Sequence, residues 1–143
     1  MKILNSFRNL FSSRTPAKTE DWAKKLNNLG FDKINFPIMI KYWNNLDIVY
    51  RFDDFAMDPD LYFHEFESKD ELIDCNGNLW TWKYDRINKV NIPSFLKRTM
   101  TLEEVKRIID THFQDSIKRK EIKSISERVT TINELLEQLA DYF

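Results

Sequence analysis

The fold is signalled most clearly by residues 71–85, ELIDCNGNLWTWKYD. Two apolar runs in this stretch flank Asn76 and Gly77. An Asn-Gly pair between apolar runs is typical of a β-hairpin, because glycine adopts a positive φ angle at little steric cost. The stretch therefore predicts two antiparallel strands joined by a tight turn.

The residues before this hairpin predict further strands. Apolar and polar side chains alternate over 38–43 and 46–53, as they do in half-buried strands. Residues 61–67 are a third strand candidate. We therefore expect an antiparallel sheet of about four to five strands over roughly residues 37–84.

Two segments predict breaks in regular structure. Residues 53–60 hold four aspartates and Pro59, which is typical of a loop. Pro93 lies within 85–100, and proline cannot donate a backbone hydrogen bond to a neighbouring strand. We therefore expect this second stretch to be irregular.

Helix signals stand on both sides of the expected sheet. Residues 19–29 carry an apolar stripe between Thr19, an N-cap residue, and Gly30, a natural helix stop. Thr101 followed by Glu104 has the pattern of a capping box at the start of another helix. The sequence thus predicts an α+β fold, with N-terminal helices and with C-terminal helices packed on the antiparallel sheet.

The last segment, residues 122–143, has apolar residues at alternating spacings of three and four. This is the pattern of a coiled coil, through which the chain would form a dimer. Leu135 and Tyr142 widen the stripe, which favours packing within the chain. Thr131 and Glu134 match a second capping box, which would divide the segment in two. The stripe consists of Ile122, Ile125, Val129, Ile132, Leu136, Leu139 and Phe143.

Residues 1–18 are expected to form an amphipathic N-terminal segment and linker before a single α+β domain at 19–143. The segment is basic, and the first acid in the chain is Glu20. It either docks on the domain or frays, which we favour, or it contacts an anionic membrane surface, or it targets the chain to an organelle. Its apolar face consists of Ile3, Leu4, Phe7, Leu10 and Phe11.

Composition excludes several large classes of protein. The only glycines are Gly30 and Gly77, so no glycine-rich phosphate loop, dinucleotide fingerprint or serine-hydrolase elbow exists. The net charge of −1 argues against nucleic-acid binding, which needs a basic footprint. No apolar run is long enough to cross a membrane, and the lone cysteine, Cys75, fits a reducing compartment. We expect a cytoplasmic protein.

No set of side chains in the sequence predicts catalysis or metal binding. Cys75 with His64 or His112 would make a nucleophile–base pair, but nothing in their spacing supports one. His64-Glu65 lacks the second histidine of a zinc-protease motif, and the aspartates do not have the spacing of a calcium-binding EF-hand loop. We expect a protein that is not an enzyme and uses neither metal nor cofactor.

An aromatic stripe lies on one face of the predicted hairpin. Exposed, it would be a platform for bases or sugars; buried, it would be part of the core. A chain with 20 aromatic residues must bury many of them, which favours the core. The stripe consists of Trp80, Trp82 and Tyr84.

An acidic block is the main functional signal. Residues 47–74 hold ten acids and two bases and lie between two basic blocks. Such segregated charge steers association with partners of opposite sign. The block predicts a protein-binding module that meets a basic partner. The predicted contact residues are Asp53, Asp54, Phe55, Asp58, Asp60 and Tyr62, with Phe55 or Tyr62 as the apolar anchor.

In size, aromatic content and acidic middle, the chain is similar to small bacterial α+β proteins that include immunity proteins of toxin systems. The resemblance implies an inhibitor that binds a basic partner without catalysis. The alternative is a peripheral membrane or homo-oligomeric assembly component. In that case the contacts would come from the N-terminal amphipathic segment and from residues 122–143.

Overall fold

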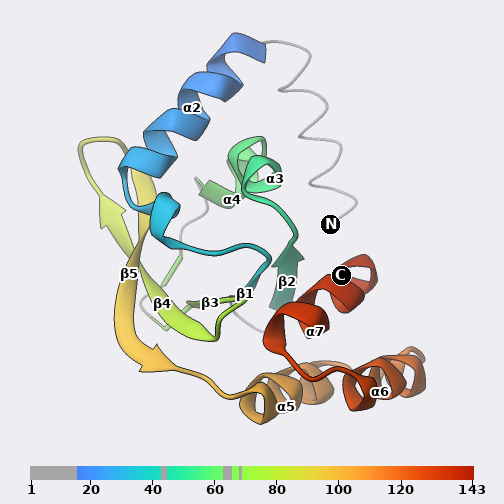
Figure 1. Cartoon of the computed structure of the whole chain (residues 1–143). Helices are drawn as coiled ribbons and strands as arrows, with labels where there is room; N and C mark the ends of the chain where they lie inside the picture. The colour runs from blue at the N-terminus through green and yellow to red at the C-terminus, as the bar shows by residue number, and fades with distance from the viewer. Residues whose placement is uncertain (1–15, 43–44, 63–65, 68) are drawn as a thin grey trace.

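The computed structural model describes residues 16–42, 45–62, 66–67 and 69–143. In this part of the chain, a five-stranded antiparallel sheet lies between two layers of helices (Figure 1). The strand order is β2-β1-β3-β4-β5. The predicted α+β fold class is confirmed. The strands are β1 (Ile38–Tyr42), β2 (Asn45–Val49), β3 (Glu71–Asp74), β4 (Asn78–Asp85) and β5 (Val90–Thr99).

Strands β1 and β3 are interior strands of the sheet, and both of their faces are buried. β1 pairs with β2 in the register Ile38↔Val49 and with β3 in the register Ile38↔Asp74. Ile38, Met39 and Ile40 follow one another in the chain, and all three are fully buried. Successive side chains of a strand point to opposite faces, so the burial of all three requires cover on both sides.

The N-terminal layer covers the face that carries Ile38 and Ile40. Phe31 and Phe55 from this layer are fully buried against that face, with ring centroids 4.8 Å apart. The ring of Phe55 also stacks on Trp82 of β4 at a centroid distance of 6.4 Å. The layer consists of α2 (Pro16–Asn28), η1 (Phe31–Lys33), α3 (Phe52–Ala56) and α4 (Pro59–Tyr62).

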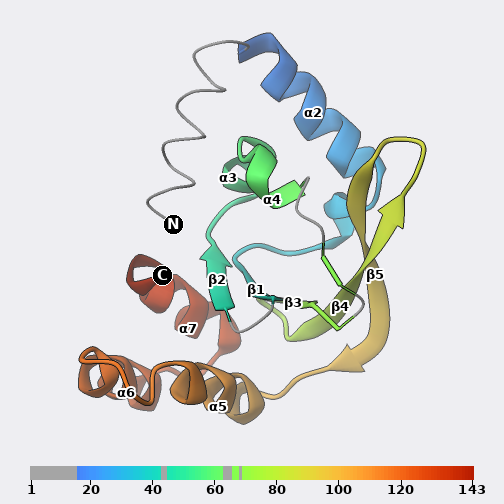
Figure 2. The same cartoon turned by 180° about the vertical axis from the view of Figure 1, so that it is seen from behind.

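The C-terminal layer covers the opposite face, which carries Met39, Ile48 and Ile73 (Figure 2). All the buried side chains of its three α-helices join the apolar cluster around those strand residues. The predicted packing of C-terminal helices on the sheet is therefore confirmed. The layer consists of α5 (Leu102–His112), α6 (Arg119–Arg128), α7 (Ile132–Leu139) and η2 (Ala140–Tyr142).

The apolar stripe of the last segment is used within the chain. Val129 has extended backbone angles, φ −85° and ψ 149°, and separates α6 from α7. Thr131 Oγ1 accepts a hydrogen bond of 3.1 Å from the backbone N–H of Glu134, so the predicted helix start is confirmed. The stripe residues before Phe143 are buried, and Phe143 packs against the same cluster. Residues 119–143 therefore present no continuous exposed seam for a coiled coil.

The β3–β4 hairpin has the predicted turn, and Asp74 holds it. Gly77 has a φ angle of +85°. The buried Asp74 carboxylate accepts hydrogen bonds of 3.0 Å from the N–H groups of Asn76 and Asn78, and one of 3.1 Å from the indole N–H of Trp80. Burial of a carboxylate is costly unless it is hydrogen-bonded, and these three donors offset that cost. Asp74 therefore stabilises the turn.

Some local predictions are wrong. Helices α3 and α4 occupy most of 53–60, where a loop was expected, and the described residues of 61–67 belong to no strand. Pro93 lies inside β5, which tolerates it because β5 is an edge strand of the sheet. Helix α2 begins at Pro16, a residue suited to the first helical position, so Thr19 and the expected end of the linker lie inside the helix.

Replacing Gly77 tests the hairpin turn. A Cβ at this position would lie 2.5 Å from the Met100 carbonyl oxygen and 2.9 Å from Ile132 Cδ1, at a positive φ that side chains disfavour. We expect Gly77→Ala to lower the free energy of unfolding in urea by about 3 kcal/mol. Gly30→Ala is the matched control, because its φ is +121° but no atom lies within 4 Å of the added Cβ. We expect a loss of about 1 kcal/mol there, and equal losses would contradict the steric account.

A double-mutant cycle tests the role of Asp74. Asp74→Ala leaves three donors without their acceptor, and we expect the free energy of unfolding to fall by about 3 kcal/mol. Trp80→Phe removes one of those donors. In the Asp74→Ala background, Trp80→Phe should therefore cost less than in the wild type, by on the order of 1 kcal/mol. Additive losses in urea denaturation would show that the indole hydrogen bond does not stabilise the hairpin.

Candidate functional site

Four acids of the 47–74 block are buried, which reduces the charge that the block presents to solvent. They are Asp47, Asp58, Asp70 and Asp74. Asp70 Oδ2 accepts a hydrogen bond of 2.7 Å from the backbone N–H of Glu67, and Asp74 holds the hairpin described above. These side chains serve the interior, so the composition of the block overstates its surface charge.

Phe55 and Asp58, two of the predicted contact residues, lie in the interior. Phe55 is fully buried against Phe31, because α3 turns this side chain toward the sheet. Asp58 is also fully buried. Burial raises the pKa of the Tyr42 phenol, and the carboxylates of Asp47 and Asp58 raise it further. The expectation that Phe55 and Asp58 are exposed to a partner is therefore corrected.

Ion pairs engage three further acids of the block. The pairs are partly exposed, so each adds little stability but offsets negative charge locally. Asp53 and Asp60 form no ion pair within the described part of the chain. The three pairs are Asp54–Arg51 at 3.9 Å, Glu67–Lys69 at 3.2 Å and Glu71–Lys41 at 3.9 Å.

Two exposed apolar side chains accompany the remaining aspartates around α3. Tyr50 exposes 48% of its surface and Met57 exposes 39%. The N–H of Met57 donates a 3.0 Å hydrogen bond to the Asp53 carbonyl, and residues one helical turn apart share a face. Sequence reasoning missed both residues as contacts, because Tyr50 lies in a segment expected to be a strand and Met57 in one expected to be a loop. We call the set Tyr50, Asp53, Asp54, Met57 and Asp60 the α3 surface.

Several predicted contacts lie outside the described residues. Tyr62 ends α4, but its side chain is outside the described part, as are His64 and Glu65. The same holds for the whole apolar face of the N-terminal segment, from Ile3 to Phe11. The contacts expected of these residues stay predictions.

The aromatic stripe of β4 is divided between core and surface. Trp80 and Trp82 are buried, as favoured above, and the ring of Phe66 stacks on Trp82 at a centroid distance of 4.2 Å and an angle of 6°. Tyr84, two residues further along the strand, is 56% exposed. The stripe is therefore no continuous aromatic platform.

A groove of about 690 Å³ lies between the β1–β2 end of the sheet and α5. Its volume lies within the range of small-molecule sites. Leu46, Met100 and Ile108 supply its apolar lining and also pack against the C-terminal core. Its polar lining includes Lys41, Asn45, Glu104, Arg107, Thr111 and His112.

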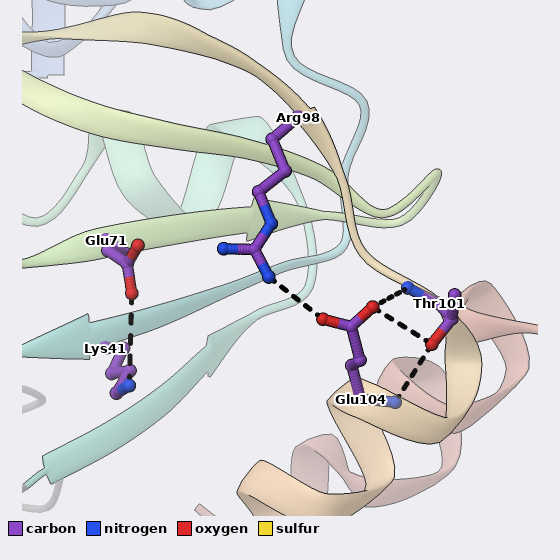
Figure 3. Close-up of polar contacts among 5 residues, drawn as sticks. All are labelled: Lys41, Glu71, Arg98, Thr101 and Glu104. Atoms are coloured by element: carbon purple, nitrogen blue, oxygen red, sulfur yellow. Dashed lines mark hydrogen bonds and ion pairs between the residues drawn. The ribbon is translucent and has the colours of Figure 1, made fainter.

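Glu104, the carboxylate that lines this groove, is engaged in structural contacts (Figure 3). Glu104 Oε2 accepts a 3.1 Å hydrogen bond from Arg98, and Oε1 accepts one of 3.4 Å from the Thr101 N–H. The Glu104 N–H donates to Thr101 Oγ1 at 3.2 Å, which completes the predicted capping box. The hydrogen bond from the Thr101 backbone holds the pKa of Glu104 below its ordinary value. Lys41 on β1 faces Glu71 on the adjacent β3.

The environments of Cys75 and His112 do not favour nucleophilic chemistry. Burial and the nearby Asp74 carboxylate raise the pKa of the Cys75 thiol, and a protonated thiol is a weak nucleophile. His112 stacks on Phe143 with centroids 6.0 Å apart, and burial lowers its pKa. Among the described residues, no three His, Cys, Asp or Glu side chains group so as to hold a metal ion.

Comparison of the chain with protein-family models, with curated proteins and with solved structures finds no match. Within the described ranges, none of the helices combines the length and apolar character needed to cross a bilayer.

The cap of α5 gives a testable contrast at the groove. Thr101→Ala removes the N-cap hydroxyl and should lower the free energy of unfolding by about 1 kcal/mol. Arg98→Ala removes only the exposed ion pair to Glu104 and should change it by less than roughly 0.5 kcal/mol. Urea denaturation followed by circular dichroism measures both. A larger loss for Arg98→Ala than for Thr101→Ala would contradict the view that the cap stabilises this helix more than the ion pair does.

Proposed function

We propose that this chain is a non-enzymatic protein-binding module that recognises a basic partner through the α3 surface. The observation that carries the proposal is the exposure of Tyr50 and Met57 within the short segment, residues 50–60, that also holds Asp53, Asp54 and Asp60. In interfaces, a few aromatic or apolar side chains supply most of the affinity, and charges around them select the partner and speed association. The α3 surface offers both kinds of group.

The sign of the charge around α3 favours a cationic partner. Residues 45–62 contain five acids, of which Asp47 and Asp58 are buried, and the other three outnumber Arg51, the one base of the segment. Arg51 lies 3.9 Å from Asp54, whereas Asp53 and Asp60 form no ion pair with described residues. A lysine or arginine of a partner could therefore pair with these two carboxylates without displacing a described lysine or arginine of this chain.

Helix α3 carries Asp53 and Asp54, and Met57 follows at its C-cap, so these three contact residues stand on an ordered base. Phe55 and Ala56 fix it in the N-terminal core, while Asp53 and Met57 lie on its exposed side. A surface that is already ordered loses less conformational entropy on binding. An immunity-type inhibitor is one form of such a module, in which the acidic surface would cover a cationic site on the partner.

Affinity capture with matched variants tests the proposal. One bait carries Asp53→Asn with Asp60→Asn, and the control bait carries Asp110→Asn with Asp115→Asn, which are exposed acids of the C-terminal layer. We expect the wild type and the control to retain the same basic protein, and the α3 variant to lose it. With the purified partner, the α3 variant should bind at least about tenfold more weakly.

Raising the salt concentration and replacing Met57 separate the contribution of the charges to binding from that of the apolar contact. Binding should weaken as salt is raised, because exposed charges are screened. Met57→Ser should weaken it at every salt concentration, since the apolar contact is not screened. A partner that is acidic, or one retained equally by the wild type and the α3 variant, would overturn the proposal. Circular dichroism confirms that each bait is folded.

A further inference from the structure

The turn between β4 and β5 is held in one shape by its own hydrogen bonds. The Asp85 carbonyl accepts a 2.8 Å bond from the Lys89 N–H. Its carboxylate accepts 2.9 Å bonds from the Ile87 N–H and from the Asn88 side-chain amide. Figures 1 and 2 both place this turn at the outer edge of the molecule, beside α2. The turn is therefore a preformed projection.

Two apolar side chains of this projection are exposed to solvent. Ile87 is 91% exposed, and Tyr84, at the end of β4, is 56% exposed. A single exposed isoleucine is common on protein surfaces and carries no conclusion alone. Here it belongs to a rigid turn with an exposed aromatic neighbour, so the charges around it decide what it can contact.

The charges around Ile87 are almost all positive. Lys83, Arg86 and Lys89 are exposed within the hairpin, and Asp85 is the only acid of residues 83–89. The Asp85 carboxylate is engaged by the turn itself. Lys25 of α2 is close enough to Asp85 to help lower its pKa, after the hydrogen bonds of the turn. The projection is therefore an apolar tip ringed by cations.

We propose that the β4–β5 turn docks this protein on an anionic membrane surface. Ile87 enters the boundary between headgroups and acyl chains, and Lys83, Arg86 and Lys89 contact lipid phosphates and carboxylates. An exposed apolar residue flanked by lysine and arginine matches the chemistry of such an interface. The site is separate from the α3 surface and goes beyond the proposed function.

The shape of the projection favours a bilayer over an acidic protein. A stable protein interface buries about 800 Å² on each partner, more than the tip of one hairpin offers to a flat surface. A fluid bilayer instead admits a narrow convex tip and surrounds it. In both views the C-terminal layer lies at the other end of the molecule from the turn, so it would face away from the membrane (Figures 1 and 2).

Vesicle co-sedimentation of the full chain tests this proposal. The probes are phosphatidylcholine vesicles with and without phosphatidylserine. We expect the wild type to sediment only with the anionic vesicles, and Ile87→Asp to reduce the bound fraction by about tenfold. The matched control is Ile117→Asp, because Ile117 is 100% exposed and precedes Lys118–Lys120, but lies between α5 and α6. This control should bind as the wild type does.

Other outcomes overturn the proposal. If the wild type does not sediment with phosphatidylserine vesicles, the turn does not bind an anionic membrane, and its cations would then fit an acidic protein instead. If Ile117→Asp, or Phe7→Asp in the N-terminal segment, abolishes sedimentation while Ile87→Asp does not, the contact lies elsewhere. Asp53→Asn with Asp60→Asn should leave vesicle binding unchanged, so this test and that of the α3 surface fail independently.

Discussion

Strands β1 and β3 of the sheet interior must be covered on both faces, and the rest of the structure depends on this constraint. Residues 38–40 and 72–73 are apolar without a break, so each face of the sheet carries large side chains. The N-terminal layer covers one face and the C-terminal layer covers the other. The apolar stripes of α5, α6 and α7 are buried in this packing. Binding surfaces must therefore come from what the two layers leave exposed.

The acidic residues of this chain fall into two groups: some accept hydrogen bonds that shape turns, and others do not. Asp74 and Asp85 both accept backbone hydrogen bonds and shape turns, one in the interior and one at the surface. Asp53, which is exposed, and Asp60, which is half-buried, shape no turn in the described structure and form no ion pair there. The net charge of a segment therefore indicates the charge of its surface only when the acids that hold the fold together are left out.

The sequence predicts those features whose causes are local. The Gly77 turn and the Thr101–Glu104 capping box depend on a few adjacent residues, and both form as expected. The sequence does not predict a strand around Pro93, because a strand tolerates this proline only at the edge of the sheet, and no local pattern reveals that β5 is an edge strand. The α3 segment was expected to be a loop because its helix depends on burying Phe55 against distant parts of the chain. For the same reason, the sequence could place acids near α3 but could not tell buried Asp58 from exposed Asp53.

Native-state hydrogen exchange tests the two-sided cover most directly. If both layers and the sheet form one cooperative unit, the amides of β1 and β3 exchange only through global unfolding, and their exchange free energy equals the free energy of unfolding. Exchange of these amides at a clearly lower free energy, together with the amides of either helical layer, would show that the sheet survives with one face uncovered. That result would contradict the central claim.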